Sequence, residues 1–549
     1  MLALAEAHLG AGRFPQAEHI CRDLLQDFPN CAEAWNHLGC ILAQRNNGLH
    51  AAACIERAIA IAPQDASFHA NLGEIYRRAG LSEQAVKYGQ RAVELAPTRD
   101  VARLNLGLAL LDLNKPDEAL TQFECVVDRM PDSAQAWFCR GRALVSLQRF
   151  EDAIAVFSRC TELAPKDPNV WLELARAGLS FNDPVNALTH ARRAAELRPG
   201  DPEPAILVSD ALVGVGALAE AEHIVREALA AIPGAPALRF RLAQLRLAQG
   251  DFREGFELYE SRLEVEAPNS IRRPALPMPM WRGEDLTGKR ILVLTEQGYG
   301  DHIQFCRFVG RLSEAASGVV FAVSPPLIEL MRSLPGRIET TTLISSARAS
   351  GCDYWTYVGS LPYHFRIGVG DIPPAPYLTA DASKRARWRE RLAPLPGRRK
   401  IGLVWAGRPE HEHDRRRSIA FERLATLARV ADVAWINPQP PSTRSGASPR
   451  VPGLTITRFP ERPVDFDDTA ALIAELDLLI SVDTSVAHLG GALGAPTWLL
   501  LSDVTDWRWN LQQDVSPWYS SMRLFRQRRH GDWEEVLERV ADALIGDAL

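Results

Sequence analysis

Apolar and polar positions along residues 1–265 follow a pattern that repeats at a fixed interval. A proline closes each interval, and successive prolines are 34 residues apart. Because proline has no N–H to donate inside a helix, each one ends a helix pair. A period of this length predicts stacked pairs of antiparallel helices that form a superhelix with a concave face. The prolines stand at positions 29, 63, 97, 131, 165, 199 and 233.

Other positions of the repeat hold small or aromatic residues. A small side chain is required where two helix backbones come closest. We interpret the tryptophans as helix-packing residues rather than as a ladder that stacks on a ligand. The pattern resembles the tetratricopeptide repeat, which implies a groove that binds an extended peptide or a partner protein; a purely structural spacer is the alternative. The residues are Ala17, Ala51, Ala85, Ala119, Ala153, Ala187, Ala221, Gly39, Gly73, Gly107, Gly141, Trp35, Trp137 and Trp171.

Short apolar runs alternate with stretches of helical periodicity after Lys289. Runs of this kind predict parallel sheets wrapped by helices. The remaining part of about 265 residues is too long for one small Rossmann sheet and suits two. A ligand then binds in the cleft between the two lobes, at the carboxyl ends of the strands. The runs cover residues 291–294, 319–323, 401–405, 478–482 and 498–501.

We expect an α-solenoid followed by an α/β region of two Rossmann-like lobes. Residues 1–267 form an array of about seven repeats. Residues 268–285 form a proline-rich linker that is extended and fairly stiff. Residues 286–385 form the first lobe and residues 386–549 the second, with the connection between them at 378–400. The linker contains Pro268, Pro274, Pro277, Pro279 and Trp281.

Composition and charge exclude several classes of protein. The chain has 549 residues, of which 46% are hydrophobic and 24% charged, as in ordinary globular proteins. Residues 1–270 contain 27 basic and 36 acidic residues, which argues against a general nucleic-acid-binding surface. The nine cysteines have no CxxC spacing, so neither a disulfide framework nor a zinc site is favoured and a cytoplasmic location fits best.

No targeting or membrane segment is predicted. The first residues have no basic region before an acidic residue appears, so a cleaved signal peptide is not expected. The longest window without Asp, Glu, Lys or Arg covers residues 484–502 and contains three glycines, a proline and a histidine. This window is typical of a buried strand, loop and helix rather than of a membrane span.

The first motif follows the first apolar run. Gly298, Gly300 and Asp301 precede a stretch of helical periodicity at 303–312. Glycines allow backbone N–H groups to approach a ligand, and the start of a helix favours negative charge. Asp301 could also simply cap the helix.

The second motif follows the run at 401–405. Gly407 is followed by Arg415, Arg416, Arg417 and Ser418. Consecutive arginines after a buried strand favour an anion site, because guanidinium groups pair with phosphate in a bidentate manner. A solvated surface run is the alternative. Two nearby histidines are spaced i, i+2 without a third ligand, so metal binding is not expected at His411 and His413.

The third motif begins with a strand that ends in Asp483, Thr484 and Ser485, followed by His488 and several small residues. This arrangement presents hydroxyl and N–H groups to a phosphate and leaves the carboxylate free to hold a sugar hydroxyl. N-capping explains Thr484 or Ser485 alone, but not the whole run.

The three motifs, in this order and spacing, resemble the bacterial heptosyltransferase-type glycosyltransferases, which have the GT-B fold and are similar to glycosyltransferase family 9. The resemblance covers roughly residues 285–545. The array fused ahead of it is similar to bacterial protein glycosyltransferases that modify flagellin and related surface proteins. The resemblance implies an inverting transfer from a nucleotide-activated sugar, with no metal or other cofactor. The first lobe would then face the acceptor and the second the donor.

The resemblance also assigns roles to residues. Asp301 matches the general base that deprotonates the acceptor hydroxyl. Arg415 and Arg417 fall where a cation stabilises the departing phosphate. Arg508, in a tail whose aromatic residues we expect to cover the sheet, is a further donor contact. The donor-binding residues are Gly298, Gly300, Gly407, Arg415, Arg417, Ser418, Asp483, Thr484, Ser485, His488 and Arg508.

One motif points to different chemistry. Asp465 and Asp467 spell the D-x-D of metal-dependent sugar transferases, directly before a helical run at 469–476. Asp467 or Asp468 is more simply the N-cap of that helix, so we do not expect a metal there.

Three hypotheses follow for the function. The first is a glycosyltransferase whose acceptor is a protein or peptide held in the groove of the array. The second is a non-catalytic adaptor with a degenerate sugar-nucleotide-binding domain. The third is an enzyme with a saccharide acceptor, in which the repeats recruit an assembly partner. Heptosyltransferases have no repeat array and use a lipid-linked saccharide, so the resemblance implies neither heptose nor lipopolysaccharide.

Overall fold

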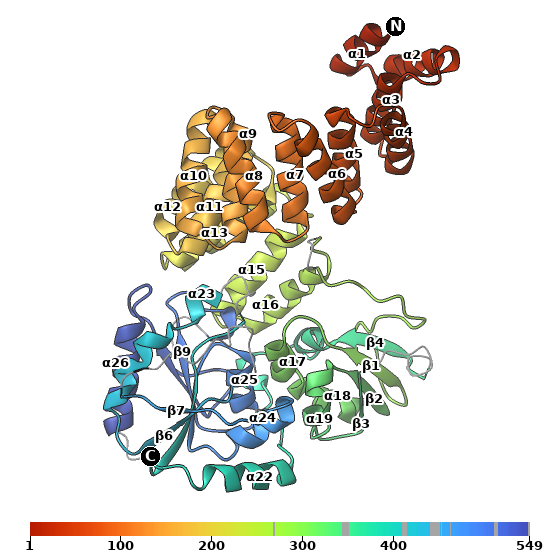
Figure 1. Cartoon of the computed structure of the whole chain (residues 1–549). Helices are drawn as coiled ribbons and strands as arrows, with labels where there is room; N and C mark the ends of the chain where they lie inside the picture. The colour runs from red at the N-terminus through yellow and green to blue at the C-terminus, as the bar shows by residue number, and fades with distance from the viewer. Residues whose placement is uncertain are drawn as a thin grey trace. The chain divides into compact units, whose positions relative to one another are not determined.

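The protein is described from a computed structural model. The structure describes residues 1–266, 270–342, 351–408, 414–439, 451, 453–461, 463–509 and 514–546. Two compact units divide the chain, Met1–Leu207 and Val208–Leu549. Stacked helices of the repeat array come first, and an α/β region with two parallel sheets follows (Figure 1). The predicted fold class, an α-solenoid followed by two Rossmann-like lobes, is therefore confirmed.

The first unit consists of helix pairs that follow the 34-residue period. Each helix is 9 to 14 residues long, and the prolines of the period fall in the short connections between pairs. The helices are α1 (Leu2–Gly10), α2 (Phe14–Asp27), α3 (Ala32–Gln44), α4 (Gly48–Ile61), α5 (Ala66–Arg78), α6 (Ser82–Leu95), α7 (Asp100–Asp112), α8 (Pro116–Arg129), α9 (Ala134–Ser146), α10 (Phe150–Leu163), α11 (Pro168–Phe181) and α12 (Pro184–Leu197), and α13 (Pro202–Gly214) spans the boundary with the second unit.

The small residues of the repeat are explained by close packing. A Cβ atom at Gly141 would lie 2.4 Å from Cε1 of Phe157, and one at Gly107 would lie 2.4 Å from Cε1 of Phe123. These distances are far below van der Waals contact, so only glycine allows the two helices of each pair to approach this closely.

The repeat tryptophans pack against the cores of their helix pairs, as predicted. Each indole N–H also donates to the carbonyl oxygen of the repeat proline six residues earlier. The distances are 2.8 Å for Trp35, 2.7 Å for Trp137 and 3.0 Å for Trp171. The tryptophan therefore satisfies a carbonyl at the turn where the proline ends the preceding helix.

The second unit begins with the remaining repeat helices and continues into the first lobe. The helices are α14 (Leu218–Ala231), α15 (Pro236–Ala248) and α16 (Phe252–Tyr259), followed by the 3-10 helix η1 (Glu260–Leu263). A four-stranded parallel sheet has the order β3-β2-β1-β4. Its strands and helices are β1 (Arg290–Leu294), α17 (Tyr299–Phe305), α18 (Arg307–Ala315), β2 (Gly318–Ala322), α19 (Ile328–Met331), β3 (Ile338–Thr341), β4 (Tyr354–Tyr357) and α21 (Leu361–His364).

The second lobe is built on a six-stranded parallel sheet with the order β10-β9-β8-β5-β6-β7. Its central strand β8 is buried along its whole length. The elements are α22 (Ala382–Leu392), β5 (Arg399–Val404), α23 (Asp414–Arg417), η5 (Phe421–Arg429), β6 (Val433–Ile436), β7 (Ile456–Thr457), α24 (Phe466–Ile473), β8 (Leu478–Val482), α25 (Ser485–Ala492), β9 (Thr497–Leu501), η6 (Trp507–Trp509), β10 (Met522–Arg526) and α26 (Trp533–Gly546).

The segment between the last repeat helix and the first lobe lies along a sheet edge. The N–H of Trp281 donates to the carbonyl oxygen of Trp355 in β4 (2.7 Å), and the N–H of Trp355 donates to that of Pro279 (3.1 Å). The Met278 and Trp281 side chains are buried. Residues 279–281, within the predicted linker, thus pair with β4.

The last repeat helices share a hydrophobic core with both lobes. Phe252, Phe256 and Tyr259 are buried in the same cluster as Ile291 of the first lobe and Leu499 of the second. At about 25 cal/mol per Å² of apolar surface, burial of three large aromatic side chains stabilises this junction by several kcal/mol. Helices α15 and α16 are therefore structural parts of the α/β unit.

Candidate active site

The loop between β1 and α17 carries the first motif. Asp301 lies in the first turn of α17, and its Oδ2 accepts the backbone N–H of Gly298 at 2.9 Å. This is the capping role considered as the alternative. The predicted helix at 303–312 begins earlier, at Tyr299, and breaks between α17 and α18 at Cys306. Asp301 is thereby placed at a helix start, where a carboxylate is stabilised.

The second carboxylate oxygen of Asp301 is paired with the other lobe. Its Oδ1 accepts from Nη2 of Arg508. Arg508 also donates from Nη1 to Asp506 Oδ1 (2.7 Å) and from Nε to Gln304 Oε1 (2.7 Å). The guanidinium carbon lies 4.2 Å from the ring centre of Trp507, and the arginine side chain is only 10% exposed. Asp301 therefore does more than cap a helix, because it holds a buried arginine across the two lobes.

Gly300 and His488 bring the first and third motifs together. A Cβ atom at Gly300 would lie 2.9 Å from Cδ2 of His488, so the glycine lets α17 pack closely on α25. His488 Nδ1 is 2.9 Å from the hydroxyl of Tyr519, and its ring centre lies 5.0 Å from that of Trp509. Burial lowers the pKa of His488 well below its usual value, as do three neighbouring arginines. The imidazole is thus neutral and holds the start of α25 in place.

The start of α25 is half-buried and carries hydroxyl groups. Thr484 is the N-cap residue, and its hydroxyl lies 3.3 Å from that of Ser481. Ser485 is the first helical residue, and both are half-buried. The unpaired N–H groups of a helix start and two adjacent hydroxyls form an environment that suits a phosphate group.

The loop after β5 folds around a buried carboxylate. Asp414 accepts from the hydroxyl of Ser418 (2.9 Å) and from Nε of Arg417 (3.4 Å). The N–H of Gly407 donates to the Ser418 hydroxyl at 2.9 Å, and a Cβ at Gly407 would lie 2.5 Å from Asp414 Oδ1. Arg417 is half-buried, whereas Arg415 is exposed. His411 and His413 lie outside the described residues.

Asp483 lies at the carboxyl end of β8 and interacts electrostatically with Arg417 and Arg508. Burial raises the pKa of Asp483 to about 6, and the carboxylate of Asp506 adds to this effect. Arg417, Trp509 and Arg508 act in the opposite direction and favour the ionised form. The structure therefore brings Asp483, Arg417, Arg508 and Asp301 into one region at the carboxyl ends of β1 and β8. Asp414 and Asp506 also belong to it, although the sequence motifs did not single them out.

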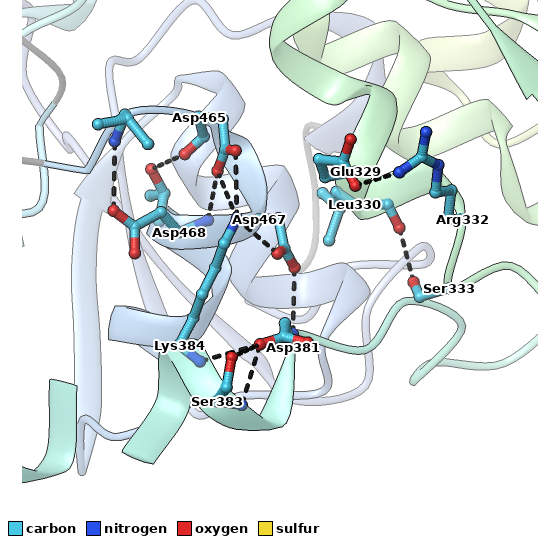
Figure 2. Close-up of polar contacts among 12 residues, drawn as sticks. Glu329, Leu330, Arg332, Ser333, Asp381, Ser383, Lys384, Asp465, Asp467 and Asp468 are labelled. Atoms are coloured by element: carbon cyan, nitrogen blue, oxygen red, sulfur yellow. Dashed lines mark hydrogen bonds and ion pairs between the residues drawn. The ribbon is translucent and has the colours of Figure 1, made fainter. Parts of the chain in front are cut away.

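The D-x-D sequence has structural partners (Figure 2). Asp465 is the N-cap of α24 and accepts the N–H of Asp468 at 2.6 Å, whereas the sequence suggested Asp467 or Asp468 as the cap. Lys384 of α22 lies 2.8 Å from Asp467 and 3.2 Å from Asp465. Asp467 also accepts the N–H of Asp381 at 3.1 Å. These carboxylates attach α22 to α24.

Neither a metal cluster nor a membrane helix is found in the described part of the chain. Within it, no three or more His, Cys, Asp or Glu side chains are grouped so that they could hold a metal ion. None of the helices it contains is both long enough and apolar enough to cross a bilayer.

The repeats of the first unit are similar to those of known proteins. The family model of the tetratricopeptide repeat matches residues 2–66, 41–100, 104–168 and 140–202. The first unit is a tetratricopeptide-repeat array. Among solved structures, the array is similar to PilF from Pseudomonas aeruginosa (21% identity, TM-score 0.34, 37% of this chain and 92% of that chain). It is also similar to the C-terminal part of a repeat protein from Cytophaga hutchinsonii (16% identity, TM-score 0.37, 44% and 99%).

One curated relative extends beyond the repeats. Protein FlbA of Caulobacter vibrioides is 29% identical over 353 residues, which cover 60% of this chain. The match spans 58% of the length of FlbA. Because the repeat helices end at Tyr259, a match to 60% of the chain must include part of the α/β region.

Replacing Asp483 with Asn should change the pH dependence of stability. The folded carboxyl has a pKa of about 6, against its ordinary value of 3.8, so its ionisation destabilises the folded state as pH rises from about 4 through 6. Asn carries no charge at any pH. Asp483→Asn is therefore expected to be more stable than wild type by roughly 2 kcal/mol at pH 7.5, and the difference should disappear near pH 4. Thermal unfolding of the full chain across this pH range measures it.

Asp542→Asn serves as the control. Asp542 is exposed on α26 and pairs with Arg429 at 2.6 Å on the surface. Exposed pairs contribute about 0 to 1 kcal/mol, so this variant should stay close to wild type throughout the pH range. An Asp483→Asn protein that unfolds like wild type at pH 7.5 would show that the Asp483 carboxylate is not destabilised by its surroundings.

Proposed function

We propose that the α/β region is an inverting, metal-independent glycosyltransferase that uses a nucleotide-activated sugar. One observation carries this proposal. Asp301 of the first lobe meets Arg508, and with it Asp483 and Arg417 of the second lobe, at the carboxyl ends of two parallel sheets. This is where ligands bind in two-lobed α/β proteins. The three sequence motifs that resemble heptosyltransferase-type enzymes thus converge on one region.

Asp301 is the proposed general base. The carboxylate accepts the proton of the acceptor hydroxyl while the acceptor oxygen forms a bond to the anomeric carbon of the sugar. The bond from that carbon to the phosphate oxygen breaks, and the nucleoside diphosphate leaves with the bonding electrons. Arg508 pairs with Asp301 and orients its carboxylate before the acceptor arrives.

The second lobe holds the donor in this proposal. The phosphates bind at the start of α25, where the hydroxyls of Thr484 and Ser485 face the ligand. Arg417, and Arg415 at the surface, stabilise the charge that develops on the departing diphosphate, as a metal ion does in other transferases. Asp483, with its pKa near 6, holds a hydroxyl group of the sugar.

The acceptor is proposed to be a polypeptide that the array recruits. A cavity of about 340 Å³ lies within the first unit, lined by residues of α9, α11 and α13 and of the turn before α11. Both charges and apolar groups line it, which suits a peptide side chain together with its backbone. A flagellin-like protein is the acceptor that the similarity to bacterial protein glycosyltransferases suggests. The lining residues are Phe138, Arg142, Asp167, Asn169, Leu172, Glu173, Arg176 and Glu203.

Asp301→Asn tests the catalytic role. A general base contributes about 10²- to 10⁴-fold to the rate, so kcat should fall at least 100-fold while donor binding persists. Turnover of a panel of UDP-, GDP-, ADP-, dTDP- and CMP-activated sugars, followed by detection of the released nucleotide, gives the rate, and calorimetry gives the donor affinity. An unchanged rate would remove Asp301 from the mechanism.

The chain contains a matched control for this variant. Gly368 and Asp371 repeat the local geometry of Gly298 and Asp301, with the same N–H to Oδ2 bond at 2.9 Å. Asp371 is exposed. Asp371→Asn makes the same change of charge in a capping residue elsewhere in the lobe and should leave turnover unchanged, which separates loss of the base from a change in the cap.

Removing residues 1–207 tests the role of the array. The remaining unit, Val208–Leu549, retains α15 and α16 and both lobes. We expect this fragment to hydrolyse the donor at the rate of the full chain, but not to label proteins in an extract of cells that lack the full-length protein. The measurement is transfer of a radiolabelled sugar to polypeptides separated by electrophoresis. Equal labelling by both forms would favour acceptor recognition by the lobes themselves.

A further inference from the structure

The end of the repeat helices contacts the loop that carries Asp301. The hydroxyl of Tyr259, the last residue of α16, donates to Oε1 of Gln297 at 3.0 Å. Arg262, in η1, donates from Nη2 to Oε1 of Glu296 at 2.8 Å. Glu296 and Gln297 are the two residues directly before Gly298, in the segment that joins β1 to α17. The loop is therefore held by α16 and η1 just before it reaches the candidate base.

The contact through Arg262 is buried and highly connected. Arg262 is 3% exposed, and its Nη2 also donates to the hydroxyl of Ser360 at 2.9 Å. Its Nη1 donates to Glu260 at 2.6 Å. Glu296 Oε1 additionally accepts the N–H of Gly359 at 3.1 Å. A buried ion pair is stable only when such hydrogen bonds hold its geometry, so this pair fixes the position of the loop firmly.

The contact through Tyr259 restrains an unusual backbone conformation. Gln297 has a φ of 68°, in the left-handed region that residues other than glycine seldom adopt. Such a conformation persists only when the surroundings hold it. Burial raises the pKa of Tyr259 above its ordinary value, so its hydroxyl remains protonated and able to donate to Gln297 at neutral pH.

The same helix end also contacts the partner of Asp301. The ring centres of Tyr259 and Phe256 lie 5.9 Å and 6.0 Å from that of Trp507. Arg508 packs on Trp507, at 4.2 Å from the ring centre. Tyr259 thus contacts the surroundings of both members of the Asp301–Arg508 pair. It donates to Gln297 in the loop that carries Asp301, and it packs on Trp507, the ring that Arg508 also contacts.

We propose that Tyr259 and Arg262 are positioning residues that set the 296–301 loop in the conformation in which Asp301 faces Arg508. The last helix of the repeat region is then part of the active site rather than an attachment point for a separate binding module. The catalytic loop is held by α16 and η1, which belong to the same unit as both lobes. This inference rests on the proposed glycosyltransferase function.

Tyr259→Phe in the full chain is the central test. The variant removes one hydroxyl and keeps the aromatic packing. Losing a hydrogen bond that holds the loop should lower kcat about fivefold, with the KM for the donor changed less than twofold. Hydrogen exchange of the amides at 298–301 should become faster, while the amides of β8 stay unchanged.

Tyr357→Phe is the matched control. Tyr357 is a buried tyrosine of the same lobe, and its hydroxyl donates to the carbonyl oxygen of Arg272 at 2.9 Å rather than to a residue of the 296–301 loop. This variant loses a hydroxyl in a similar environment and should retain the wild-type kcat and the wild-type exchange at 298–301. Equal effects of the two variants would mean that Tyr259 acts only through general stability, which would overturn the proposal.

A double-variant experiment isolates the contact itself. Gln297→Gly removes the acceptor amide and supplies a residue that adopts the positive φ readily. If Tyr259 acts through Gln297, Tyr259→Phe should have no further effect on kcat in the Gln297→Gly background. Effects that multiply would show that the two residues act independently, and the proposal would then be wrong.

Arg262 is tested by charge and rescue. Arg262→Met leaves Glu296 buried without its cation and should lower kcat more than Tyr259→Phe does, whereas Arg262→Lys should restore part of the loss. If the Lys variant is as slow as the Met variant while both fold, the charge on residue 262 does not position the loop.

The failure of the proposed function and the failure of the positioning role are distinguishable. If wild type releases no nucleotide from any donor, the glycosyltransferase function is wrong. If wild type is active and Tyr259→Phe matches it, only the positioning role is wrong.

Discussion

The ion pair between Asp301 and Arg508 connects the two lobes, and the arrangement of the site depends on it. The pair joins the first turn of α17 to the segment after β9. Arg508 is buried, so its charge needs the carboxylates of Asp301 and Asp506 around it. With both lobes held at this point, the half-buried start of α25 and the cation Arg417 stand near the candidate base. The pair thereby orients the Asp301 carboxylate in the resting protein.

A second constraint comes from the last repeat helices. Helices α15 and α16 belong to the hydrophobic core of the α/β unit, and η1 contributes the buried Arg262. The first unit, up to Leu207, contains the tetratricopeptide repeats matched by the family model, whereas α15, α16 and η1 support the loop that carries Asp301. These last repeat helices therefore belong to the same unit as the candidate site.

Much of the fold could be predicted because its signals are local. The 34-residue period predicted the helix pairs, and the long apolar runs coincide with β1, β2, β5, β8 and β9. Strands such as β3 (IETT) and β10 (MRLFR) were not predicted, because polar residues interrupt their apolar pattern. The N-cap of α24 is Asp465, since several acidic residues in succession leave the choice of cap to tertiary contacts such as that with Lys384.

The candidate site was predictable only as three separate motifs. Their local sequences indicated Asp301, Arg417 and Asp483, but nothing local indicates that Arg508 pairs with an aspartate 207 residues away. The same holds for Arg262 and Glu296, which belong to regions with different periodicity. Which of these residues pair with one another depends on long-range contacts and burial, which exist only in the folded chain.

The position of a bound donor is the sharpest test of the proposed active site. A structure of the full chain with a nucleotide sugar selected from the panel by calorimetry would show it. We expect the diphosphate at the start of α25, within hydrogen-bond distance of Ser485 and Arg417, and the anomeric carbon on the side of Asp301. A donor bound with its diphosphate away from α25, or with its sugar turned away from Asp301, would rule out this active site.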